Sequence, residues 1–167
     1  FVEMLVVITV VTMLAVLLLP GLANARKRAQ LITCNGFLKQ IGLGFKQWSL
    51  DHTNALPMDL ATNLGGTKEW IPTGETFRHF EVISNELNTP YVLVCPADSG
   101  RLRVRSFHPT LSNSNVSYFI GLLADDSQPQ MIFAGDRNIW NAVRPINGVV
   151  GLTTRNTTGW AAGLHEG

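Results

Sequence analysis

The first fifty residues carry two hydrophobic patterns, one after the other. Between Glu3 and Arg26 no side chain is charged, and nearly all are apolar. A bilayer core about 30 Å thick needs about 20 helical residues to cross it, and the stretch from Met4 to Ala23 meets that need. The pattern predicts a helix that is apolar on every side.

After Pro20-Gly21 the apolar positions become periodic. They recur at steps of three and four residues, at Leu31, Cys34, Leu38, Ile41, Phe45 and Trp48. This spacing places them on one face of an amphipathic helix. The helix should end near Asp51-His52, because Thr53, Asn54 and Pro57 follow. We expect one rod over residues 2–52, about 75 Å long at 1.5 Å per residue.

The remaining residues, 53–167, show shorter elements separated by Gly, Asn and Pro. We expect a loop from Asn54 to Pro72 and a short helix from Glu75 to Leu87. Strands are predicted at Tyr91–Val94, Ser117–Ile120 and Gln130–Ala134, with weaker signals at Val149–Thr153. The predicted fold class is α+β: a long N-terminal helix, kinked or melted near Pro20, packed through its apolar face on a small domain with an antiparallel sheet.

This pattern divides the chain into three segments. Residues 1–25 form the hydrophobic half of the rod, residues 26–52 the amphipathic half, and residues 53–167 a globular head domain. With 167 residues the chain is one ordinary domain plus a tail, and much of its 46% hydrophobic content lies in the first twenty positions. The net charge of only +1 produces no strong electrostatic field that would attract nucleic acid. The sequence leaves open whether the chain binds nucleic acid.

Three interpretations of the opening segment compete. Ala23-Asn24-Ala25 resembles the cleavage site of a secretory signal, but a basic stretch before the apolar run is missing. A plain membrane anchor is the second, with Arg26 to Arg28 marking the cytoplasmic side. In the third, Phe1 carries a free ammonium that a carboxylate, Glu3, of a neighbouring copy neutralises, so that identical helices stack together.

The third interpretation agrees with a family resemblance. The segment resembles the N-terminus of mature type IV pilins and type II secretion pseudopilins, which begin with Phe, carry a Glu and then an apolar helix with a Pro. Glu3 and Pro20 are 17 positions apart, as in that family (20 − 3 = 17). The family has three residues between Phe and Glu, whereas this chain has only Val2. The resemblance covers about fifty residues.

The resemblance implies a life history and a set of assembly residues. A prepilin peptidase would remove a basic leader, leaving the helix in the bacterial inner membrane until the pilus or secretion machinery assembles a homopolymer of identical subunits. Phe1, Glu3, Pro20 and Gly21 would act in subunit assembly. The rod would be unwound between about Ala15 and Ala23 in a filament. The expected location is an extracellular filament at the cell surface.

Two runs in the head domain carry a second resemblance. Cys95-Pro96-Ala97-Asp98 and Ala134-Gly135-Asp136-Arg137-Asn138 look like loops common in pilin-like proteins of some environmental bacteria.

Signs of catalysis are few. Asp51-His52 stands at a helix end, where both residues commonly cap or face water, and His79, His108 and His165 are isolated in the sequence. The chain has no Cys-x-x-Cys-His for haem, no G-x-S-x-G and no P-loop. We therefore expect no enzyme activity and no cofactor.

A few residues suggest other chemistry. Asp125, Asp126 and Asp136 are weak candidates for Ca²⁺, and a solvated acidic turn is the favoured explanation for them. Cys34 and Cys95 could form a disulfide in an oxidising compartment, or Cys34 could serve as a small buried hydrophobe. Asn115 and Asn156 each begin a glycosylation triplet.

The expected function is that of a pilin-like structural subunit that polymerises through its N-terminal helix. The first alternative is a pseudopilin of a type II secretion system. A further alternative is a membrane-anchored periplasmic binding or enzymatic domain, which would have a concave polar pocket in residues 53–167 and would tolerate replacement of Glu3.

Overall fold

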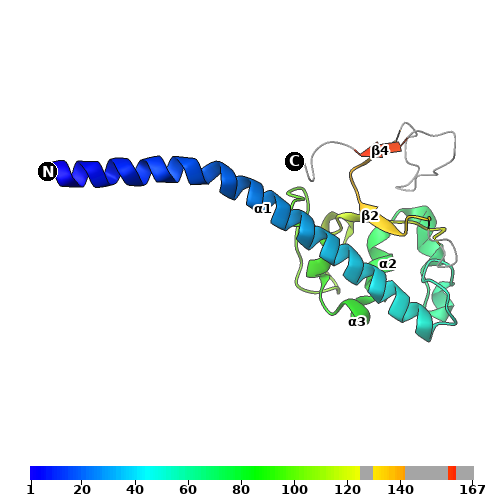
Figure 1. The fold of residues 1–167 in the computed structure, drawn as a ribbon. Helices are drawn as coiled ribbons and strands as arrows, with labels where there is room; N and C mark the ends of the chain where they lie inside the picture. Colours follow the sequence, from blue (N-terminus) through cyan, green and yellow to red (C-terminus); the bar gives the residue numbers. More distant parts are fainter. Residues whose placement is uncertain (125–129, 142–157, 161–167) are drawn as a thin grey trace.

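A long helix and a small domain make up the computed structural model of the chain, which describes residues 1–124, 130–141 and 158–160. The helix, α1, runs from Val2 to Asp51. Figure 1 shows that its first half projects away from the domain and its second half lies across it. The α+β architecture predicted from the sequence is confirmed, and α1 begins and ends within a residue of the predicted bounds.

Helix α1 passes through Pro20 without interruption. Proline removes one backbone donor and crowds the preceding turn, which bends a helix. Figure 1 shows α1 bending between its projecting part and the domain. In this single chain the rod is bent and not melted. Local unwinding within an assembled filament stays a prediction.

The second half of α1 buries the predicted apolar stripe. Cys34, Ile41, Phe45 and Trp48 are at most 4% exposed. The stripe begins later than expected, because Leu31 is 42% exposed. Phe45 packs edge-to-face on Phe80 and Phe133, at centroid distances of 5.9 and 5.1 Å. This face of α1 therefore forms one wall of the hydrophobic core.

Short helices fill the first part of the domain. They are η1 (Thr62–Leu64), η2 (Lys68–Thr73), α2 (Thr76–Val82), α3 (Ser84–Leu87), η3 (Pro90–Leu93) and η4 (Asn113–Asn115). The segment expected to be a loop thus contains two 3₁₀ turns. The single helix expected from Glu75 to Leu87 is divided at Ile83, whose side chain is fully buried.

The strand predicted at Tyr91–Val94 is wrong, because most of that segment is the 3₁₀ helix η3. Pro90 opens η3, and its fixed φ suits the start of a helical turn. The Thr89 hydroxyl accepts a hydrogen bond from the Tyr91 backbone N–H at 3.3 Å. The buried Val92 and Leu93 contribute to the core from this turn.

Two small antiparallel sheets follow. Strand β1 (Tyr118–Ile120) pairs with β2 (Ala134–Asp136), with Tyr118 opposite Asp136. Strand β3 (Ile139–Asn141) pairs with β4 (Thr158–Trp160). The strand predicted at Ser117–Ile120 is confirmed, whereas the one predicted at Gln130–Ala134 lies later, at β2. The weak prediction at Val149–Thr153 lies outside the described residues.

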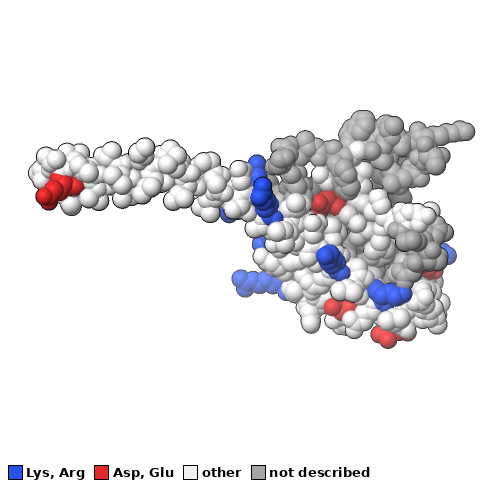
Figure 2. Space-filling view, viewed as in Figure 1, with Lys and Arg blue, Asp and Glu red and all other residues white. Residues whose placement is uncertain are grey.

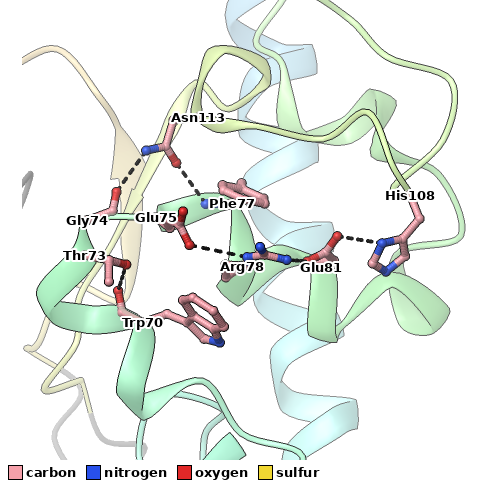
Figure 3. Close-up of polar contacts among 9 residues, drawn as sticks. All are labelled: Trp70, Thr73, Gly74, Glu75, Phe77, Arg78, Glu81, His108 and Asn113. Carbon is pink, nitrogen blue, oxygen red and sulfur yellow. Dashed lines mark hydrogen bonds and ion pairs between the residues drawn. The ribbon is translucent and has the colours of Figure 1, made fainter.

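A polar network fixes α2 on the domain surface (Figure 3). The Asn113 side chain accepts a hydrogen bond from the Phe77 N–H and donates one to the Gly74 carbonyl, at 3.1 and 2.9 Å. Arg78 lies over the Trp70 and Phe77 rings and forms an ion pair with Glu81 at 2.9 Å. The side chains thus satisfy the first turn of α2 and link it to η2 and η4.

Candidate functional sites

The apolar half of α1, residues 2–25, contributes nothing to the hydrophobic core formed by the described residues. Every residue from 1 to 29 is exposed, including large side chains such as Leu5, Val11 and Leu18. By length and composition α1 is suited to cross a membrane, and its most apolar window is not buried at all. In Figure 2 this part of the rod is almost entirely uncharged.

Charges mark the two ends of this surface. Glu3 lies in the first turn of α1, and Arg26, Lys27 and Arg28 follow the apolar residues. Figure 2 shows acidic atoms at the tip of the rod and basic atoms where the rod meets the domain. The negative charge of Glu3 in the first turn also complements the partial positive charge of a helix N-terminus.

The four predicted assembly residues all lie on this surface. Phe1, Glu3, Pro20 and Gly21 are exposed, and a side chain at Gly21 would meet nothing within 4 Å. Packing within this chain therefore does not explain these residues. Hydroxyls within the segment are satisfied locally, since Thr9 and Thr12 donate to the carbonyls of Leu5 and Ile8 at 2.8 and 2.9 Å.

A second cluster joins α1 to the domain. Cys34, Cys95 and Asp136 each offer a sulfur or carboxylate atom, and these atoms all lie within 4.8 Å of one another. The Cys34 thiol donates to Asp136 Oδ1 at 3.2 Å, and its sulfur lies 3.3 Å from the Tyr118 hydroxyl. Both cysteines are 1% exposed, and neither is in a disulfide. We call these four residues the cysteine cluster.

Backbone pairing brings the members of the cysteine cluster together. Tyr118 and Asp136 face each other across β1 and β2. Next to this pair, Arg137 follows the end of β2 and Ser117 precedes the start of β1. The Arg137 N–H donates to the Ser117 carbonyl at 3.0 Å, and the Ser117 N–H donates to the Leu93 carbonyl at 2.9 Å. This row of hydrogen bonds holds η3, β1 and β2 beside one another, so that Cys95 and Asp136 approach α1 together.

An ion pair braces the same region. Arg137 donates from Nε and Nη2 to the two carboxylate oxygens of Asp98, at 2.7 and 2.8 Å. Burial pushes the pKa of Asp98 upward, but the hydrogen bonds from Arg137 and the charge of Arg137 outweigh it, so the pKa is lowered. The two sequence runs that begin at Cys95 and Ala134 thus meet in space through both their cluster residues and this pair.

Protonated sulfur and phenol groups are favoured in the cysteine cluster. The pKa of the Cys34 thiol is raised strongly, first by a hydrogen bond with Cys95 and then by burial. Burial, followed by the contact with Cys34, raises the pKa of Tyr118. Both shifts favour the protonated forms of Cys34 and Tyr118.

Several sequence predictions can be placed. Cys34 and Cys95 come together as predicted, while the disulfide itself stays a prediction. Asp136 lies beside sulfur and phenol groups, which suit the hard Ca²⁺ ion poorly. Asp125, Asp126 and Asn156 lie outside the described residues.

Glycosylation at Asn115 stays a prediction, and the structure places this residue in the interior of the domain. Asn115 is 4% exposed, and its amide nitrogen donates to the Leu102 carbonyl at 2.8 Å. Its Oδ1 accepts from the Ser112 N–H at 2.9 Å. Because the acceptor nitrogen is buried and bonded, the folded domain does not present it to a glycan.

The described histidines have structural partners. His52 stacks on Trp48 at a centroid distance of 3.7 Å, and its Nδ1 lies 2.9 Å from the Trp48 carbonyl. His79 is buried against the Thr67 hydroxyl at 2.6 Å, and burial lowers its pKa to about 4. His108 contacts Glu81 at 2.9 Å. Their positions at a helix end, in the core and on the surface separate these three side chains.

Sequence reasoning missed Tyr118 and the Asp98–Arg137 pair. Tyr118 stands at the start of a correctly predicted strand, but nothing local indicates that it faces Cys34. The doublet Asp136-Arg137 at the end of a strand was the available signal, because neighbouring strand residues point to opposite faces.

No protein-family model, curated protein or solved structure is significantly similar to this chain.

Proposed function

We propose that this chain is a pilin-like structural subunit that polymerises through the apolar half of α1 into an extracellular helical filament. The supporting observation is a rod whose residues are exposed on every face, with none of the described residues of the chain covering them. Such a surface needs lipid or other copies of itself, because apolar area in water is unfavourable.

Glu3 favours copies of the chain over lipid as the final environment. A carboxylate at the end of an otherwise uncharged apolar rod is costly in a bilayer unless it is paired. In a bundle of identical helices, the amino terminus of a neighbouring copy can supply the positive partner. The Glu3-to-Pro20 spacing, which resembles that of type IV pilins and pseudopilins, supports the same proposal.

The proposed pathway begins in the inner membrane and ends in the filament. Met4 to Ala23 would span about 30 Å as a helix, enough for a bilayer core. Pilus or secretion machinery would then transfer subunits to the growing polymer, whose core is built from these helices. The head domains cover the outside, and the subunit carries out no chemistry of its own.

Replacement of Glu3 tests this proposal. The full-length chain is expressed as wild type, Glu3→Ala, Glu3→Gln and the control Asp51→Asn, whose exposed carboxylate lies at the other end of α1. Filaments sheared from cells are quantified and imaged by electron microscopy. Both Glu3 variants should lose most or all polymer, while tryptophan fluorescence shows a folded domain and the control assembles normally.

Normal filaments from Glu3→Ala would contradict the proposal and favour a tethered domain. Filament length separates the two related functions: long, abundant fibres indicate a pilus, and short periplasmic assemblies indicate a pseudopilus.

A further inference from the structure

We propose that Cys34, Cys95 and Asp136 bind a thiophilic divalent cation, with Zn²⁺ as the best fit, and that this ion links α1 to the head domain. The inference does not depend on filament assembly. It rests on three ligand-bearing side chains that come together from separate parts of the chain. Cys34 lies in α1, Cys95 is the second residue after η3, and Asp136 ends β2.

The spacing fits a tetrahedral ion. Zn–S bonds of about 2.3 Å and Zn–O bonds of about 2.1 Å place tetrahedral ligand atoms roughly 3.5–3.8 Å apart. The three candidate atoms lie within 4.8 Å of one another, and the Cys34 Sγ to Asp136 Oδ1 distance is 3.2 Å. The three atoms therefore lie close to the separations that a tetrahedral ion requires. The Tyr118 oxygen, 3.3 Å from Cys34 Sγ, is a further candidate ligand beside them.

The ligand chemistry selects the ion. Thiolates favour soft or borderline ions such as Zn²⁺, and a carboxylate completes many zinc sites. Ca²⁺ and Mg²⁺ prefer oxygen ligands throughout. Two sulfurs with one carboxylate therefore exclude the hard cations as the preferred occupants.

Replacing the two thiol protons with Zn²⁺ leaves the net charge of the site unchanged. Without metal, two neutral thiols and one carboxylate carry a net charge of −1. Binding replaces two thiol protons with one Zn²⁺, so two thiolates, one carboxylate and the ion again sum to −1. The two protons leave to solvent, so metal binding adds no net charge to this buried site. The nearby Asp98 carboxylate is already neutralised by Arg137 and does not add to this sum.

The surroundings hold the ligands in place. Tyr118 and Asp136 are paired in register across β1 and β2, and the hydrogen bonds from Ser117 to Leu93 and from Arg137 to Ser117 fix the strands beside η3. Ligands held in this way lose little freedom on binding, which raises affinity. The ion would connect α1, just beyond its apolar half, to the sheet.

Metal titration of the full-length chain in detergent tests the proposal. The protein is purified with a phosphine reductant, stripped with a chelator and titrated with Co²⁺, whose thiolate charge-transfer band reports sulfur ligation, and then with Zn²⁺. We expect one ion per chain, displacement of Co²⁺ by Zn²⁺, and protection of both cysteines from alkylation. Zinc retained after dialysis, measured by mass spectrometry, should match this stoichiometry.

Variants determine which residues bind. Cys34→Ser and Cys95→Ser should lose the charge-transfer band. The isosteric Asp136→Asn should weaken Zn²⁺ binding by roughly 10–100-fold or more, the range known for the loss of supporting groups around zinc. Asp51→Asn, an exposed carboxylate, is the matched control and should bind as wild type.

Three outcomes would overturn the proposal. The first is a reduced wild-type chain that retains no metal. The second is Asp136→Asn protein that binds Zn²⁺ as tightly as wild type, which would remove the carboxylate from the site. The third is native protein, isolated without reductant, with a mass two hydrogens lower and a Cys34–Cys95 crosslinked peptide; the sulfurs would then form a covalent bridge and would not hold an ion.

Discussion

The two halves of α1 differ in how much apolar side chain they carry and in how it is arranged around the helix. From residue 2 to residue 25 apolar residues surround the helix, and all are exposed. From Cys34 to Trp48 most of them lie on one face, which is buried in the domain core, and Leu43 is the exposed exception. A striped helix finds its partner in its own chain, whereas an evenly apolar helix must find it elsewhere.

This difference explains why one continuous helix can serve two purposes. The striped half is held by the core and by contacts such as Phe45 on Phe80 and Phe133. The apolar half has no such contacts with the part of the chain that the structure describes, and its surface is exposed to lipid or to other copies. A mutation should therefore affect domain stability in one half and assembly in the other.

Truncating the core side of α1 should have the largest effect on stability. Phe45→Ala removes a ring that is 1% exposed, and such changes cost about 3–5 kcal/mol of unfolding free energy. Leu14→Ala, at 56% exposure, should leave the domain's unfolding unchanged. Urea unfolding of the full chain in detergent, followed by tryptophan fluorescence, measures both. Similar losses from the two variants would contradict the separation of the halves.

Acid should weaken the domain and not the apolar half of the rod. The folded pKa of His79 is about 4 and its ordinary value 6.5, so the unfolded chain binds the proton more readily. Stability from this group is complete above 6.5 and decreases as pH falls toward about 4, by at most about 3 kcal/mol.

Unfolding free energies measured across that pH range check this expectation. His79→Gln is the control, because it should flatten the pH dependence. An unchanged slope in that variant would assign the acid sensitivity to other groups.

Substitutions at three glycines on α1 should give the smallest effects. A side chain at Gly42 would meet nothing within 4 Å, so Gly42→Ala should stabilise the domain by about 0.5–1 kcal/mol through helix propensity. At Gly44 the added carbon would lie 3.1 Å from Leu87 Cδ2, which offsets that gain. Gly21→Ala, in the apolar half, should leave domain stability unchanged. The same unfolding experiment ranks the three variants, and a larger gain at Gly44 than at Gly42 would contradict the packing described here.

The sequence predicted best where one strong pattern acted alone. The 3.6-residue periodicity located the buried face of α1, and the helix-ending residues after Asp51 located its end. Prediction failed where local preference and packing disagreed. Tyr91 to Val94 has residues typical of strands, yet Pro90 and the Thr89 hydroxyl favour a 3₁₀ turn that places Val92 and Leu93 in the core.

The candidate sites show the same limit. Glu3 and Pro20 could be identified from the sequence, because their meaning depends on spacing along one helix. The cysteine cluster could be identified only in part. Cys34 and Cys95 were recognised as a pair, but their approach to Asp136 and Tyr118 depends on strand register and on a backbone row through Ser117. Contacts between residues about a hundred positions apart leave no local signal.

Electron microscopy of the native protein, in whole cells and in the sheared surface fraction, tests the central claim most directly. The account predicts polymers with residues 2–25 of many copies bundled at the axis and head domains outside. Full-length protein that remains dispersed in the cell envelope as single units, with no polymers of any length, would contradict it.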